Sequence, residues 1–120
     1  MEVFVFDAVR SPRGRGRPDG SLAEVTPPIL VSQLIDAFRQ RNAGALVENT
    51  DSLTLSCVTQ TGAQGGHIAV ASKLLSDLPE TAVPLSLNNF CVGGLSAVAA
   101  AARRIACGEN DIALAGGVES

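Results

Sequence analysis

The segment around Cys91 constrains the fold of this chain more than any other part of its sequence. An extended apolar stretch, residues 83–87, runs into the cysteine, and an alanine-rich helical pattern, residues 95–106, starts soon after it. This order predicts that Cys91 lies on a tight strand-to-helix turn, with its sulfur near a helix N-terminus. Backbone N–H groups and the helix dipole favour negative charge there. The thiol should therefore lose its proton more easily than a free cysteine, which suits a nucleophile for acyl transfer.

The rest of the chain alternates between extended and helical patterns. The predicted strands cover residues 3–8, 52–58, 83–87 and 111–115, and the predicted helices cover residues 27–42, 68–75 and 95–106. Thr26 and Pro27 suit the start of the first helix, and its end is placed near Asn42. Gly108 suits the left-handed position at the end of the last helix. This order predicts one α/β domain, residues 1–120, with a mostly parallel sheet and helices packed in layers.

Small residues follow Cys91. Gly93 and Gly94 are expected to permit a sharp turn, so that Gly94→Val should damage folding or acylation. The helix after them carries six alanines between residues 97 and 106. A helix this thin can be packed closely, and we expect it to be mostly buried.

Composition limits the kind of protein. With 120 residues and 46% hydrophobic residues, there is material for one core. A net charge of -3 and the lack of Trp and Tyr give no reason to expect nucleic-acid binding. No apolar run is long enough to cross a membrane, and residues 1–7 do not look like a secretory leader. Three cysteines, an odd number, then favour a reducing compartment, and we expect the cytoplasm.

Other candidate residues are weaker. Cys57 falls in a predicted strand and is interpreted as a small core residue, and Cys107 falls at a helix end. The cysteine spacing predicts no metal site. His67, the only histidine, could serve as a base to Cys91, but a structural role at a helix start is favoured.

Two loops raise the question of phosphate binding. Arg13, Arg15 and Arg17 could grip a phosphate, although a solvated or interface loop is favoured. Residues 60–66 resemble a phosphate-cradling loop only loosely, because the Lys-Ser/Thr pair of a P-loop is missing. We therefore expect no nucleotide site, and the sequence leaves any cofactor-binding residues unknown.

Residues 87–98, Leu-Asn-Asn-Phe-Cys-Val-Gly-Gly-Leu-Ser-Ala-Val, resemble the nucleophile motif of the thiolases, the acetyl-CoA acyltransferases. Residues 115–120, Ala-Gly-Gly-Val-Glu-Ser, resemble the glycine-rich strand end of that family. Residues 9–22 and 64–69 are similar to two of its loops, so the resemblance covers the whole chain. Gly93 stands where a serine is usual, Val70 where an arginine is common, and Asn89 where a basic residue is common.

The resemblance implies a layered thiolase-like N-terminal domain that is incomplete relative to the family. Cys91 would hold an acyl group as a thioester, with its backbone N–H as an oxyanion donor. The reaction would be β-ketoacyl-CoA thiolysis or acetoacetyl-CoA formation, with coenzyme A thioesters as substrates and no bound cofactor. The histidine and second cysteine that the family uses for proton transfer have no counterpart in these 120 residues. The chain alone is therefore expected to be inactive, and its expected partner is another copy or a C-terminal thiolase part.

Two alternatives remain open. The chain could be a non-catalytic folding or assembly fragment, or a relative of the condensing enzymes that use carrier-protein thioesters. The segments at residues 9–22 and 116–120 favour a thiolase over the carrier-protein reading. Only activity separates the thiolase from the assembly fragment.

Overall fold

The fold alternates helices and strands along most of the chain. The computed structural model describes residues 1–120, apart from the side chains of residues 42 and 43. The helices are α1 (Pro27–Phe38), α2 (Gly44–Glu48), α3 (Ile68–Leu75) and α4 (Gly93–Ala106), and the strands are β1 (Ser52–Ser56), β2 (Val83–Leu87) and β3 (Ala113–Gly117). A π-helical turn, Arg39–Ala43, joins α1 to α2, and short 3-10 turns occupy Gly62–Gln64 and Phe90–Val92.

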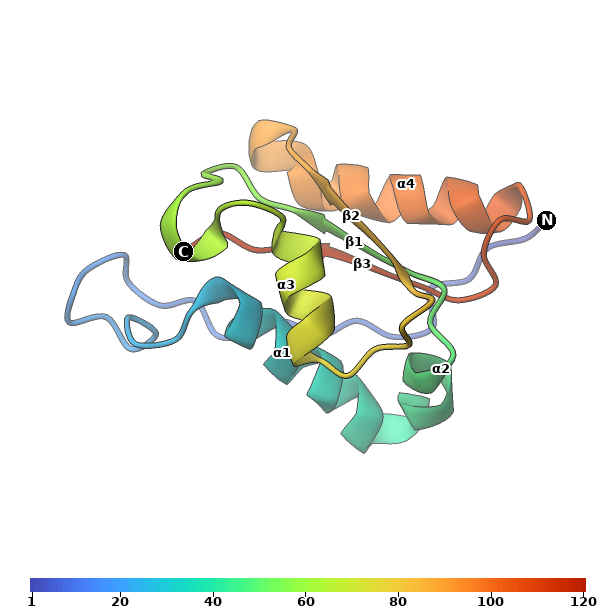
Figure 1. Ribbon diagram of the computed structural model, residues 1–120, viewed down its shortest axis with the longest axis horizontal. Coiled ribbons are helices and arrows are strands. Elements are labelled where there is room, and N and C mark those ends of the chain that lie inside the picture. Colours follow the sequence, from blue (N-terminus) through green and yellow to red (C-terminus); the bar gives the residue numbers. More distant parts are fainter.

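The three strands form one parallel sheet in the order β2-β1-β3. Ser52 of β1 pairs with Val83 on one side and with Ala113 on the other. Helix α4 covers one face of the sheet, and α1 and α3 lie on the opposite face (Figure 1). The predicted α/β class, with a parallel sheet between helices, is confirmed. In parallel strands all carboxyl ends reach the same edge, so Ser56, Leu87 and Gly117 end side by side.

The central strand β1 is buried on both faces but differs between them. Leu53 and Leu55 belong to the hydrophobic core, together with residues from α1 and α3. The alternate residues Ser52, Thr54 and Ser56 are small and polar, and side chains alternate along a strand. They therefore face α4, which can approach β1 closely.

Helix α4 is less buried than expected. Its buried residues are Gly93, Ala97 and Ala101, which share one stripe at four-residue spacing. Leu95 and Val98 on the other side are exposed. The prediction of a mostly buried helix is wrong, because within the described chain only the stripe facing the sheet is covered.

The N-terminal segment does not form the predicted strand. Residues 3–8 have no regular secondary structure, and the side chains of Phe4 and Phe6 are 79% and 69% exposed. An apolar run becomes a strand only when a free strand edge hydrogen-bonds to it, and in the described chain this segment pairs with none. An ion pair between Asp7 and Arg41, 3.1 Å long, holds its end.

The helical backbone also continues beyond the predicted end near Asn42. Arg39, just after α1, pairs with Asp36 and Glu48, each at 2.8 Å. Its guanidinium also donates to the backbone oxygens of Ser76 and Asp77 after α3. This side chain therefore links α1, α2 and the end of α3.

In the part of the chain that the structure describes, no helix has the length and apolar character needed to cross a bilayer.

Candidate functional site

Cys91 lies at the centre of the 3-10 turn between β2 and α4, and it is exposed. The N–H of Gly93 donates to the carbonyl of Phe90 and closes this turn. Phe90 has a φ of 48°, in the left-handed region that larger side chains rarely adopt. Such a conformation persists only when neighbouring contacts hold it. The predicted strand-to-helix position of Cys91 is confirmed, and the turn is strained next to the thiol.

Two asparagines hold this turn. The Asn88 Oδ1 accepts a hydrogen bond from the Phe90 N–H at 2.9 Å, and the Asn88 Nδ2 donates to the Val58 carbonyl at 3.3 Å. The Asn89 Nδ2 donates to the Ser96 hydroxyl of α4 at 2.8 Å. The turn is thereby tied to the loop after β1 and to α4. The sequence places Asn89 where a basic residue is common, and here it makes a neutral contact.

Of the two glycines after Cys91, the structure requires only Gly93, and for a different reason than expected. Gly93 has an ordinary helical φ of −59°, and Gly94 is not among the residues with positive φ. A Cβ on Gly94 would meet no atom within 4 Å. The structure therefore gives no reason for damage by Gly94→Val through the turn. A Cβ on Gly93 would collide with Ser56.

The other two cysteines are a core residue and a residue at a helix end, as the sequence predicts, but β1 ends at Ser56, so Cys57 lies just after the strand and not within the predicted residues 52–58. Cys57 is 1% exposed and belongs to the hydrophobic core. Burial, followed by the charge of Glu119, raises the pKa of the Cys57 thiol. Cys107 is exposed at the end of α4, where its Sγ donates to the Arg104 carbonyl at 3.4 Å.

His67 has a structural role. Its Nδ1 accepts from the Val70 N–H at 3.3 Å and caps α3, and it lies 2.8 Å from the Ser86 hydroxyl. Ser86 accepts from the Ala69 N–H, which leaves its own hydroxyl proton to donate to Nδ1. This network assigns the proton of neutral His67 to Nε2. Because Nδ1 already accepts two hydrogen bonds and Nε2 already carries a proton, neither ring nitrogen is available to take a proton from Cys91.

Glu119 forms a second cluster at the same edge of the sheet. Its carboxylate accepts hydrogen bonds from the N–H groups of Val58 at 2.8 Å and Thr59 at 3.2 Å, and from the Gln64 amide at 3.0 Å. Gln64 is only 4% exposed and also accepts from the Ser120 N–H at 2.9 Å. The loop at residues 60–66, which loosely resembles a phosphate cradle, thus binds the Glu119 carboxylate, an anion of the same chain. Sequence reasoning missed this contact because 55 residues separate Gln64 and Glu119.

These donors change the acidity of Glu119. Hydrogen bonding by the Thr59 side chain, followed by the backbone and Gln64 donors, lowers the pKa of Glu119 from 4.5 to about 2, although burial opposes it. A group with a lowered pKa in the folded state stabilises the fold above its unfolded pKa. That contribution is lost as the pH falls from about 4.5 toward 2.

Glu119→Gln should therefore destabilise the chain by roughly 1 kcal/mol at pH 7, at the low end for charged hydrogen bonds because the carboxylate is partly solvated. Urea unfolding at pH 7 and pH 3 would measure this, and the difference from the wild type should shrink at pH 3. Glu24→Gln is the matched control, since Glu24 is exposed. Equal destabilisation at both pH values would contradict the assignment.

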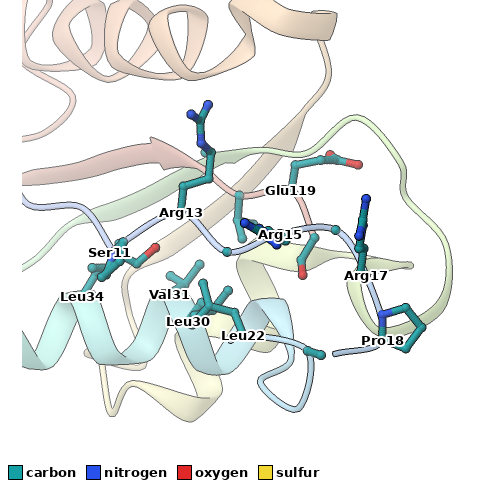
Figure 2. A pocket seen from close by; sticks show the side chains of 17 residues that line it. Ser11, Arg13, Arg15, Arg17, Pro18, Leu22, Leu30, Val31, Leu34 and Glu119 are labelled. Atoms are coloured by element: carbon teal, nitrogen blue, oxygen red, sulfur yellow. The ribbon is translucent and has the colours of Figure 1, made fainter. Parts of the chain in front are cut away.

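The three arginines line a surface hollow of about 650 Å³ between the loop at residues 11–23, α1 and the end of β3 (Figure 2). Leu22, Leu30 and Val31 form its apolar wall. Arg13, Arg15 and Arg17 are exposed, and Cys91 is not among the lining residues. The hollow therefore includes the arginine loop but not Cys91. No group of His, Cys, Asp and Glu that could hold a metal occurs among the described residues.

Comparison with known proteins agrees with this geometry. Residues 3–120 match the family model described as Thiolase, N-terminal domain. The chain is 41% identical to a beta-ketoadipyl-CoA thiolase of Pseudomonas aeruginosa over 99% of its own length and 29% of that protein. It is 35% identical to a 3-ketoacyl-CoA thiolase of Alcanivorax borkumensis, over 98% of its length and 30% of that protein.

A solved structure supports the fold. The crystal structure of the Bacillus anthracis acetyl-CoA acetyltransferase superposes with a TM-score of 0.74 at 27% identity. The match covers 84% of this chain and 25% of the other. The chain therefore spans less than a third of the length of these relatives.

Proposed function

Because the chain belongs to the thiolase family, we propose that Cys91 is the nucleophile of an acyl transfer to and from coenzyme A. The Cys91 sulfur attacks the carbonyl carbon of an acyl-CoA thioester, and a new carbon–sulfur bond forms. The bond to the CoA sulfur then breaks, and the Cys91 proton leaves with the CoA thiol. Attack by CoA on the acyl-cysteine reverses the step and transfers the acyl group.

The observation that carries this proposal is the exposed position of Cys91 between β2 and the 14 residues of α4. The first N–H groups of a helix have no partner within it, and the Cys91 N–H lies just before them. We assign it as one donor to the oxyanion that forms when the carbonyl is attacked.

The names of the relatives indicate the substrate class. They are thiolases of 3-ketoacyl-CoA and beta-ketoadipyl-CoA, and an acetyl-CoA acetyltransferase. We extend this to the present chain as β-ketoacyl-CoA thiolysis or acetoacetyl-CoA formation, in which Cys91 carries the acyl group. Coenzyme A thioesters are favoured over carrier-protein thioesters for the same reason.

In thiolysis the Cys91 sulfur attacks the β-keto carbon, the bond between the α- and β-carbons breaks, and the α-carbon takes up the Cys91 proton and leaves as acetyl-CoA. CoA then removes the acyl group from Cys91, and acetoacetyl-CoA formation is the reverse of these steps.

Incubation with acetyl-CoA should add one acetyl group to the intact mass of the chain. Peptide mapping should place that group on Cys91, and neutral hydroxylamine should remove it, as expected of a thioester. Cys91→Ala should reduce acetylation to background, while Cys107→Ala, which removes the other exposed cysteine, should leave it unchanged.

Other results of the acetylation experiment would favour one of the two alternatives, an assembly fragment or a relative of the carrier-protein enzymes. Acetylation at another residue, or none in a chain folded by circular dichroism, would reject Cys91 as the nucleophile of this chain and favour an assembly fragment. Acetylation from an acetylated carrier protein but not from acetyl-CoA would favour the carrier-protein relative.

A further inference from the structure

The first turn of α4 approaches β1 so closely that residue 93 has no room for a side chain. A Cβ on Gly93 would lie 1.8 Å from the Ser56 Oγ and 2.8 Å from the Ser56 Cβ. Rotation of the Ser56 hydroxyl could relieve the shorter contact. It could not relieve the longer one, because the Cβ is bonded directly to the backbone of β1. Since Gly93 has a helical φ of −59°, glycine is required by space and not by backbone conformation.

Ser56 cannot easily move away from α4. It is the last residue of the central strand, is 4% exposed, and pairs in register with Leu87 and Gly117. Its carbonyl also accepts a hydrogen bond from the Val118 N–H at 3.0 Å. The neighbouring strand is close as well, since a Cβ on Gly117 would lie 3.5 Å from the Gly94 Cα. The Ser56 side chain therefore sets the distance between the sheet and the start of α4.

The same contact fixes the Cys91 turn. Gly93 is both the first residue of α4 and the donor that closes the turn on the Phe90 carbonyl. Only Val92 separates Gly93 from Cys91, and Phe90 is already strained at a φ of 48°. A shift of Gly93 away from Ser56 must therefore displace the thiol or break the turn.

We propose that Ser56 is a positioning residue for Cys91, and that positions 56 and 93 form a pair of which only one can carry a side chain. The incompatibility of two side chains at positions 56 and 93 follows from packing alone. The importance of this pair for acyl transfer rests on the proposed function of Cys91. The pair also accounts for glycine at position 93, where the family resemblance leads us to expect serine. A serine there is compatible with this packing only if residue 56 loses its side chain.

A double-mutant cycle in the full 120-residue chain tests the pair, using Gly93→Ser, Ser56→Gly and the double variant. One readout is the thermal midpoint by circular dichroism. The other is the iodoacetamide labelling rate of Cys91 divided by that of Cys107 in the same molecule. The second readout reports on the Cys91 turn, since both cysteines are already exposed and a general loss of stability would not change the labelling of Cys91 alone.

Gly93→Ser should lower the midpoint by roughly 5–15 °C, as overpacking of a core does, and change the labelling ratio at least about threefold. In the Ser56→Gly background the same substitution should have almost no effect on either readout. Gly94→Ser is the matched control, because a Cβ on Gly94 meets no atom within 4 Å. It should leave both readouts near those of the wild type.

Equal damage by Gly93→Ser in both backgrounds would overturn the pair. If the effect of Gly93→Ser on the thermal midpoint depends on residue 56 but the labelling ratio does not change, the positioning role of Ser56 would be overturned. If Gly93→Ser does not fold, Gly93→Ala is compared in the Ser56, Ser56→Ala and Ser56→Gly backgrounds, where soluble yield should rise in that order. Failure of acetyl-CoA to modify Cys91, with the coupling intact, would reject the proposed function and leave the steric pair standing.

Discussion

Limiting iodoacetamide is expected to modify Cys91 about 2- to 7-fold faster than Cys107, and to leave Cys57 unmodified in the folded chain. Cys91 and Cys107 are both exposed and lie at opposite ends of the same helix, α4. The N-terminal end of a helix stabilises negative charge on sulfur, whereas the C-terminal end destabilises it. Each effect amounts to about 0.3–1 kcal/mol, and roughly half of their sum appears in the rate, because a more stable thiolate is also a weaker nucleophile.

Cys57 is protected for separate reasons. It is 1% exposed, and burial together with the charge of Glu119 raises the pKa of its thiol. The three cysteines thus provide a reactive site, an exposed reference and a buried reference in one chain. Peptide mapping by mass spectrometry after short labelling times gives all three rates.

Salt and urea are the controls for the labelling experiment. High salt should reduce the preference for Cys91, because it screens the charge at an exposed helix end. In urea the rates of the three cysteines should converge. Faster labelling of Cys107 in the native chain would show that the helix end does not control reactivity, and would remove one argument for Cys91 as the nucleophile.

Much of the fold is predictable from local sequence. The predicted elements at Ile68–Leu75 and Val83–Leu87 are found with the same bounds. Gly108, predicted to take the left-handed position after the last helix, has a φ of 81°. These elements have clear periodicity and clear end signals, namely a proline, a loop or a glycine. Cys91 was placed correctly for the same reason, since its position depends only on its immediate neighbours.

Elements that depend on distant partners were predicted less well. The final strand lies at Ala113–Gly117 and not at residues 111–115, because pairing with β1 decides its register. Asp51 holds the preceding residues instead, with its carboxylate accepting from the N–H groups of Asp111 and Ile112. Residues 3–8 look like a strand but find no partner strand among the described residues.

The contacts that support the site are also distant in sequence. Glu119 reaches Val58 across 61 residues, and Ser56 at the end of β1 lies against Gly93 at the start of α4. No local pattern of spacing indicates that either pair meets. In each case a small or polar residue at the end of a strand is placed by the parallel register. The strand-to-helix position of Cys91 could therefore be predicted from sequence, whereas these distant contacts could not.

The 120-residue chain is expected to stop at the acyl-enzyme. Acetoacetyl-CoA should give at most one equivalent of acyl transfer per chain and then no steady turnover. Thiolysis requires a base for the incoming CoA thiol, and such proton transfer commonly contributes about 10²- to 10⁴-fold in rate. His67 is the only histidine, and its Nδ1 is occupied by Ser86 and Val70 while its Nε2 carries the proton in the neutral ring.

Loss of acetoacetyl-CoA in the presence of added CoA, measured at high protein concentration, would test this, with Cys91→Ala as the background. His67→Gln should leave the first equivalent of transfer unchanged, since His67 caps α3 and takes no part in the acylation step. Steady turnover that requires Cys91 and is abolished by His67→Gln would show that His67 leaves its cap to act as a base. Turnover that survives His67→Gln would require another base within the chain. Either result would contradict the expected arrest, which assumes that Cys91 can accept an acyl group and that none of the described residues acts as a base to pass the group on to CoA.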